Sequence, residues 1–169
     1  SGFGDRCIVN GKLFEKIPTK WSTEEASALP IVCLTVEYTL AELAMKHFST
    51  SPHDVGSKNI LIHAGTGGVG LVAIQYAQHF GWEVFATCSE SKRSKLIEIG
   101  VKPENIANSR DAKDILKFPK DMDICLNSLS DEFIENSFNL LKSGGIFLEI
   151  GKRNIWSTEE ASERFPNIS

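Results

Sequence analysis

The segment Gly65-Thr66-Gly67-Gly68-Val69-Gly70 follows directly on the apolar run Ile60-Leu61-Ile62. Glycines at this spacing, between a strand and a helix, can hold the pyrophosphate of a dinucleotide. Gly65 would permit a tight turn, Gly67 would let the backbone approach the phosphates, and Gly70 would let the next helix pack closely. The N–H groups and positive dipole end of that helix would face the phosphates. The segment therefore predicts a nucleotide site; the alternative is a purely structural glycine turn.

The end of the next predicted strand bears on which nucleotide would bind. In NAD-binding domains a carboxylate at that position takes the ribose hydroxyls. Here the strand ends as Thr87-Cys88-Ser89 without a carboxylate, although Glu90 is adjacent. Lys92 and Arg93 follow at the start of a helix. A 2′-phosphate would meet a hydroxyl and two cations, and two charge-assisted hydrogen bonds would favour NADPH over NADH by about a hundredfold. The alternative is that Lys92 and Arg93 form a solvated helix face.

Further polar residues stand at the carboxyl ends of later predicted strands, where ligands bind in open α/β sheets. Ser109 ends the third strand and Arg110 follows it. Arg110 would lie beside the adenine or the 2′-phosphate, or else be a surface charge. Asn127 and Ser128 end the fourth strand, and Gly151 follows the fifth. We expect these three residues to line the nicotinamide side.

The segments that must position these residues alternate between strand and helix patterns. Apolar residues at helical spacing follow the glycines as far as Ala77, and Gly81 is typical of a helix end. Alternation of this kind predicts a parallel sheet covered on both faces, a doubly wound Rossmann fold with strand order 3-2-1-4-5. After the strand over 83–87, helices are expected over 92–99, 111–117 and 131–141, and strands over 105–109, 122–127 and 146–150.

The N-terminal part has a different pattern. Residues 7–14 suggest a short hairpin with Asn10-Gly11 as its turn. Ser22 and Glu25 form a capping box, and the helix that they begin is expected to stop at Leu29-Pro30. A longer helix is expected over 32–48, where Leu34, Tyr38, Ala41, Met45 and Phe48 recur at helical spacing. We expect Tyr38 to be a packed helix residue; the alternative is a catalytic acid.

One sequence of seven residues, Trp-Ser-Thr-Glu-Glu-Ala-Ser, occurs at 21–27 and again at 156–162. We interpret it as two similar capping boxes rather than a repeat architecture. Residues 164–169 have apolar content but no evident partner element. We therefore expect the chain to be cut from something longer.

Composition excludes several classes of protein. The chain has 169 residues and a net charge of −4, which favours one domain and gives no reason to expect nucleic-acid binding. No apolar run approaches the roughly 18 residues of a membrane helix, so we expect a cytoplasmic protein.

The cysteines lack C-x-x-C pairs and metal-ligand spacing, so we expect reduced thiols without zinc or disulfides. We expect Cys33, Cys88 and Cys125 to be small core residues; Cys7 is the fourth cysteine.

Longer blocks of sequence carry a family resemblance between Ile17 and Arg153. Here the chain resembles the enoyl reductase domain of type I fatty acid and polyketide synthases, in the medium-chain dehydrogenase/reductase superfamily. Asn-Ser-Leu at 127–129 and Leu-Glu-Ile-Gly-Lys at 148–152 are the most specific blocks. The others are Ile17-Pro18 with Trp21 to Pro30, Leu34-Thr35 with Tyr38, His63 to Gly70, Ser89 to Arg93, and Asn108 to Asp111.

The resemblance implies NADPH-dependent reduction of an enoyl thioester carried on an acyl carrier domain within a synthase. Hydride would go to the β-carbon and a proton to the α-carbon. Lys152 matches the lysine proposed as the proton donor in the family, and Thr35 would approach the nicotinamide. The alternative is that Lys152 only contacts cofactor or solvent. Residues 1–18 would be the tail of a GroES-like β-barrel substrate domain, and 19–169 the NADP-binding domain, truncated at its C-terminus.

Competing functions remain open at this point. One is a quinone or alkenal reductase of the same superfamily, acting on free small molecules. Another is a non-catalytic NADPH-binding module within a synthase. A methyltransferase-type fold is disfavoured by Gly70 and by the Lys92-Arg93 pair. We expect this chain alone to bind NADPH and to turn over little or no enoyl substrate.

Overall fold

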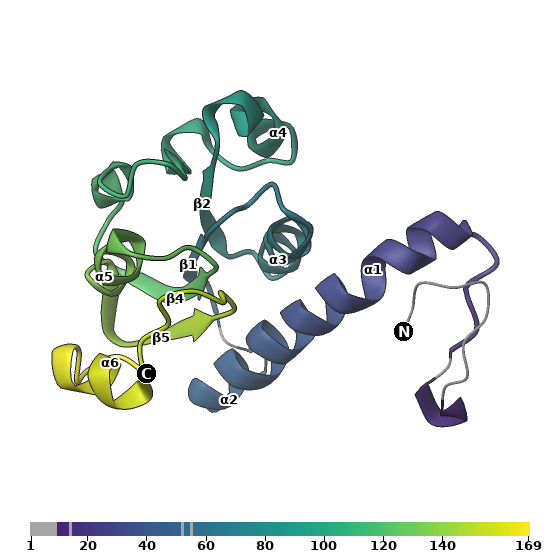
Figure 1. Cartoon of the computed structure of the whole chain (residues 1–169), viewed down its shortest axis with the longest axis horizontal. Coiled ribbons are helices and arrows are strands. Elements are labelled where there is room, and N and C mark those ends of the chain that lie inside the picture. Colours follow the sequence, from purple (N-terminus) through teal and green to yellow (C-terminus); the bar gives the residue numbers. More distant parts are fainter. Residues whose placement is uncertain (1–9, 14, 52, 55) are drawn as a thin grey trace. The chain divides into compact units, whose positions relative to one another are not determined.

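A computed structural model describes residues 10–13, 15–51, 53–54 and 56–169 (Figure 1). It divides into two compact units, Ser1–Ile31 and Val32–Ser169, and the boundary falls within helix α1, Thr23–Val36. Gly11–Leu13 form a single 3-10 turn, η1. The rest of the hairpin expected over 7–14 lies almost entirely outside the described residues.

Helix α1 begins as the sequence predicts but does not end there. The backbone N–H of Ser22 donates to Glu25 Oε2 at 2.8 Å, and that of Glu25 donates to Ser22 Oγ at 3.1 Å, which confirms the capping box. The expected stop at Leu29-Pro30 is wrong, because α1 continues through Pro30 to Val36. A proline inside a helix removes one backbone hydrogen bond and bends the axis, but the helix can resume beyond it.

The helix continues through η2, Glu37–Ala44, and α2, Met45–His47. From the end of α1 to α2 the buried residues are Val36, Thr39, Leu40, Ala44 and Met45. Leu34 and Tyr38, which the spacing had placed with Met45, are 64% and 62% exposed. The expectation of a packed Tyr38 is therefore wrong.

By length and composition, the 25 residues Thr23–His47 could cross a membrane, since a window of 18 residues within them has a mean hydropathy of 1.5. The sequence had led us to expect no such segment. This finding is weak evidence for a membrane span, since core helices of soluble proteins pass the same test. Leu40 and Ala44 are buried among the core residues of the sheet domain.

Five parallel strands form one sheet in the order β3-β2-β1-β4-β5, which confirms the predicted topology. Leu61 of the central strand lies beside Phe85 on one side and Cys125 on the other. Because the order reverses between β1 and β4, the sheet has a switch point there. The strands are β1 Asn59–Ile62, β2 Glu83–Cys88, β3 Ile106–Asn108, β4 Met122–Asn127 and β5 Leu141–Glu149.

Helices cover both faces of the sheet, and α3 and α5 lie on opposite sides of it in Figure 1. Ile60 and Ile62 pack with Ile74 of α3 on one face, while Leu61 packs with Ile134 and Phe138 of α5 on the other. The helices are α3 Gly68–His79, α4 Arg93–Glu98, α5 Glu132–Phe138 and α6 Thr158–Arg164, with 3-10 turns η3 Glu90–Lys92, η4 Pro103–Asn105 and η5 Asp114–Lys117.

The second copy of the seven-residue sequence also begins a helix. Ser157 Oγ accepts the N–H of Glu160 at 3.1 Å at the start of α6. The segment after α6 does have a partner, contrary to expectation, because the ring of Phe165 stacks on Phe138 with centroids 4.8 Å apart. Ser169 then bonds along the β5 edge, donating to the carbonyl of Gly145 at 3.0 Å and accepting from Phe147 at 2.7 Å.

Two of the three described cysteines are core residues as expected. Cys88 and Cys125 are buried, whereas Cys33 on α1 is exposed, so that part of the expectation is wrong. Cys7 lies outside the described residues.

Candidate functional site

The glycine turn joins β1 to α3 in a conformation set by backbone bonds. The N–H of Gly65 donates to the carbonyl of Thr87 at 2.8 Å, and the N–H of Gly67 donates to that of Ala64 at 2.8 Å. Gly67 is the residue before α3 and has extended dihedral angles, with no side-chain cap. The first N–H groups of α3 therefore have no capping side chain and can meet an anion.

The outer and inner glycines of the motif have different surroundings. Gly65 and Gly70 are buried, whereas Gly67 and Gly68 are exposed. A Cβ on Gly70 would lie 2.5 Å from the carbonyl oxygen of Ala64, so α3 approaches the turn too closely for any side chain. Gly70 thus allows α3 to pack closely against the turn. Gly67 and Gly68 leave the backbone of the turn exposed, and Thr66 and Val69 beside them are half-buried.

A buried polar network lies directly under this turn. Thr87 Oγ1 accepts the N–H of Ala64 at 3.1 Å and pairs with Nδ1 of His63 at 3.2 Å. The other ring nitrogen of His63 pairs with Ser137 Oγ of α5 at 2.7 Å. Burial lowers the pKa of His63 from 6.5 to about 3, so the ring is neutral at pH 7. His63 thus packs under the turn as a buried residue; Thr87 and Ser137 were not among the expected site residues.

The cationic residues expected near a 2′-phosphate have separate environments. Lys92 is exposed at the end of η3, and its backbone N–H donates to the carbonyl of Ser89 at 2.9 Å. The guanidinium of Arg93 donates to the carbonyls of Ile106 at 3.0 Å and Pro103 at 2.5 Å. Arg93 therefore ties α4 to the segment that enters β3.

Ser109 and Arg110 lie next to this region. The N–H of Ser109 donates to the carbonyl of Cys88 at 2.8 Å, which joins the ends of β2 and β3. Ser109 and Arg110 line a cavity of about 620 Å³ that continues to Leu129 and Phe133. The ends of β3 and β4 therefore share one opening.

A second cavity gathers the residues expected on the nicotinamide side. Its volume is about 310 Å³, and its lining includes Ser128, Gly151 and Lys152. Among the described residues, Ser128 Oγ is buried and has no hydrogen-bond partner. Lys152 is exposed. The cavity lies at the carboxyl ends of β4 and β5, beside the switch point of the sheet.

Glu149 was not among the expected site residues, although it contacts two of them. Its Oε1 accepts the N–H of Gly151, and its Oε2 accepts Nδ2 of Asn127 at 2.7 Å. Asn127 is completely buried at the end of β4. The local sequence around Glu149 does not indicate this role, because Asn127 is 22 residues away in the chain.

Thr35 lies on α1 and lines none of the cavities described here. Its helix does reach the glycine turn, since a Cβ on Gly68 would lie 3.0 Å from Cγ1 of Val32. The carbonyl of Thr35 accepts the hydroxyl of Thr39 at 2.7 Å. Thr35 thus lies three residues after Val32, the residue of α1 that approaches Gly68 of the glycine turn.

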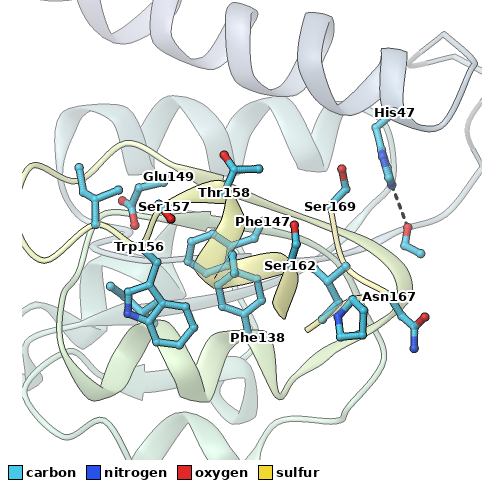
Figure 2. Close-up of a pocket in the computed structure, with 16 residues that line it drawn as sticks. His47, Phe138, Phe147, Glu149, Trp156, Ser157, Thr158, Ser162, Asn167 and Ser169 are labelled. Atoms are coloured by element: carbon cyan, nitrogen blue, oxygen red, sulfur yellow. Dashed lines mark hydrogen bonds between the residues drawn. The ribbon is translucent and has the colours of Figure 1, made fainter. Parts of the chain in front are cut away.

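A further cavity of about 520 Å³ lies between α6 and the β5 edge, as Figure 2 shows. The rings of Phe138 and Phe147 stack there with centroids 4.2 Å apart, and the ring of Trp156 stacks on Phe138 with centroids 5.5 Å apart. None of the residues expected in the nucleotide site lines this cavity. We therefore place the candidate site at the glycine turn and the Lys152 cavity.

The chain is similar to a known protein family and to several synthases. A family model described as zinc-binding dehydrogenase matches residues 68–167. A Mycobacterium bovis protein, phenolphthiocerol synthesis polyketide synthase type I, is 37% identical over 99% of this chain. A Mycobacterium tuberculosis relative with the same identity and coverage is named as an inactive synthase of this kind. The chain spans only 8% and 10% of these two relatives.

Solved structures agree with these relatives. The CurK enoyl reductase is 38% identical with a TM-score of 0.80, over 90% of this chain and 44% of that one. The nucleotide-binding subdomain of the PpsC enoylreductase domain from Mycobacterium tuberculosis is 27% identical with a TM-score of 0.60, over 79% and 75%. A Thermus thermophilus quinone oxidoreductase, solved also with NADPH, is 26% identical with a TM-score of 0.67, over 89% and 47%.

The name of the matching family raises the question of a metal. Within the described part of the chain, no three His, Cys, Asp or Glu side chains gather closely enough to hold an ion. These residues therefore do not fit a zinc site. The matched span shows that the chain belongs to the zinc-binding dehydrogenase family, and the relatives and neighbours show that it is similar to a region of polyketide synthases and to enoyl reductases.

Proposed function

We propose that this chain is the cofactor-binding part of an NADPH-dependent enoyl-thioester reductase. The observation that carries the proposal is the cavity lined by Ser128, Gly151 and Lys152, at the same edge of the sheet as the glycine turn. Open α/β sheets bind dinucleotides across their switch point, which here lies between β1 and β4. The glycine turn would take the pyrophosphate and the Lys152 cavity the nicotinamide.

The adenosine side supports NADPH rather than NADH. No carboxylate ends β2; instead Ser89 follows it and Lys92 lies exposed one turn later. An exposed ammonium near a 2′-phosphate would form a charge-assisted hydrogen bond. Arg93 already donates to two carbonyls, so we assign the larger electrostatic contribution to Lys92 and a supporting role to Arg93. Ser109 and Arg110 would border the adenine.

The reaction needs a hydride source and a proton source. NADPH would supply the hydride for the β-carbon of the enoyl chain. The ammonium of Lys152 would donate a proton to the α-carbon as negative charge develops on the thioester oxygen, and solvent would then reprotonate the amine. Ser128 Oγ, buried and unpaired in the described structure, is suited to hydrogen-bond the bound cofactor. Thr35 would approach the nicotinamide from α1.

The relatives are much longer than this chain, which spans 10% and 8% of the two mycobacterial synthases. We propose that residues 1–18 belong to a GroES-like substrate domain and that 19–169 form the NADP-binding domain. The enoyl chain would arrive on an acyl carrier domain of the same cytoplasmic synthase. The likeness to the Thermus thermophilus quinone oxidoreductase supports one second candidate, a reductase of free quinones or alkenals. Dependence of activity on a carrier-bound substrate separates the two.

Paired calorimetric titrations of NADPH and NADH test the cofactor assignment. We expect the chain to bind NADPH at least tenfold more tightly than NADH, and Lys92→Ala to remove about tenfold of the NADPH affinity while leaving NADH unchanged, because one charge-assisted bond is lost. Lys95→Ala, on the exposed surface of α4, is the matched control and should leave both affinities unchanged. Equal losses for both cofactors in Lys92→Ala would contradict the 2′-phosphate assignment.

A further inference from the structure

We infer that Glu149 is a positioning residue. Its carboxylate fixes the relative position of the two loops that border the Lys152 cavity, and thereby the geometry of the proposed nicotinamide site. This inference rests on the proposed function. Glu149 is the last residue of β5 and does not itself line the cavity. It would act only through the residues that it bonds.

Both carboxylate oxygens of Glu149 accept hydrogen bonds, and the two donors come from different loops. Oε1 takes the backbone N–H of Gly151 at 2.5 Å, on the loop after β5. Oε2 takes the side-chain amide of Asn127 at 2.7 Å, at the end of β4. An ionised carboxylate is acceptor-only and can satisfy both donors at once. Glu149 thus links the two strand ends that border the cavity.

The side chain of Asn127, which Glu149 binds, also forms hydrogen bonds with the loop that contains Ser128. Its Nδ2 also donates to the carbonyl of Leu129 at 2.7 Å, and its Oδ1 accepts the N–H of Leu129 at 3.2 Å. The carbonyl of Asn127 accepts the N–H of Ile150 at 2.9 Å, next to Glu149. Leu129 is therefore held on both of its backbone polar groups. Ser128 lies between two residues that this network orients.

On the loop after β5, Gly151 leaves room for the Glu149 carboxylate because it has no side chain. A Cβ on Gly151 would lie 2.6 Å from Oε1 of Glu149, so the carboxylate occupies the space that a side chain would need. Gly151 does not have a positive φ, so its lack of a side chain matters here for space. Lys152 follows directly, and its backbone position depends on the Gly151–Glu149 bond. A side chain at position 151 would therefore require the Glu149 carboxylate to move from its present place.

Replacing Glu149 by glutamine keeps the shape and removes one acceptor. The NH₂ of the introduced amide would face either Asn127 Nδ2 or the Gly151 N–H, and two donors cannot bond each other. We expect Glu149→Gln to weaken NADPH binding tenfold or more and to leave unchanged the affinity for 2′-phosphoadenosine diphosphate ribose, which lacks the nicotinamide. The Gly151 amide should lose its protection against hydrogen exchange, while amides of β1 keep theirs.

Calorimetry with the two ligands and amide exchange on the same chain provide the test. Gly151→Ala disturbs the same contact from the other side and should reproduce the selective loss without removing a charge. Glu98→Gln, an exposed position on α4, is the matched control and should change nothing. Unchanged NADPH binding in Glu149→Gln, or equal losses for both ligands, would overturn the inference. Failure of the proposed function would appear instead as no NADPH binding by the unsubstituted chain, and it would overturn the inference as well.

Discussion

Gly70→Ala is expected to destabilise the chain by about 3 kcal/mol, at the upper end of the range for overpacking a core. The added Cβ would lie 2.5 Å from the Ala64 carbonyl oxygen and 2.7 Å from Gly65 Cα. Both obstacles are backbone atoms, so no side-chain rotation relieves the clash. Alanine has a helix propensity about 1 kcal/mol better than glycine, which is too small to compensate. Urea unfolding followed by circular dichroism measures the difference.

Gly67→Ala is the matched comparison within the same motif. Its Cβ would meet the Ala64 carbonyl oxygen at 3.2 Å, a tight contact but one that a small shift can relieve. We expect a loss of under about 1 kcal/mol in stability, with NADPH binding weakened because the methyl group would stand on the exposed phosphate-facing backbone. Similar unfolding midpoints for Gly67→Ala and Gly70→Ala would contradict the separate roles given to the two glycines.

Acidification is expected to destabilise the domain through His63. The pKa of this ring is about 3 in the folded chain because of burial, against 6.5 for an exposed histidine. The unfolded chain therefore binds one more proton between these values, so the stability that neutral His63 provides is complete above pH 6.5 and is lost as the pH falls towards 3. At pH 5 the expected loss is about 2 kcal/mol.

Chemical unfolding at several pH values between 4 and 8 measures this contribution. His63→Gln keeps hydrogen-bonding groups under the glycine turn but cannot titrate, so its stability should fall less steeply below pH 6.5 than that of the unsubstituted chain. His79→Gln, at an exposed helix position, controls for the loss of an imidazole as such. If His63→Gln shows the same pH slope as the unsubstituted chain, the assignment of this titration to His63 is wrong.

Local patterns were enough to predict the sheet and the glycine turn. Strand order follows from the alternation of strands and helices, and Gly65, Gly67 and Gly70 stand where the motif requires them. Helix starts were also predictable, since both copies of the seven-residue sequence begin a helix with a serine cap. Both features depend on residues a few positions apart in the chain.

Features that depend on distant partners were not predictable. Arg93 bonds the carbonyls of Ile106 and Pro103, which the motif around it does not indicate. The buried face of the long helix includes Leu40 rather than Tyr38, because the sheet decides which side of the helix is covered. Glu149 reaches Asn127 from another strand, 22 residues away in the chain. Such pairs become visible only when the fold brings them together.

Because the exposed Cys33 lies on α1 and the other described cysteines are buried, a thiol reagent should label α1 selectively. Burial raises the pKa of the Cys88 and Cys125 thiols, and both side chains lie inside the domain, so maleimides should spare them. Cys33 is exposed on α1, two residues before Thr35 and next to Val32, which borders the glycine turn. With Cys7 replaced by serine, one fluorophore on Cys33 would stand beside the phosphate end of the site. Its emission would then report the arrival of a dinucleotide in real time, without any turnover of substrate.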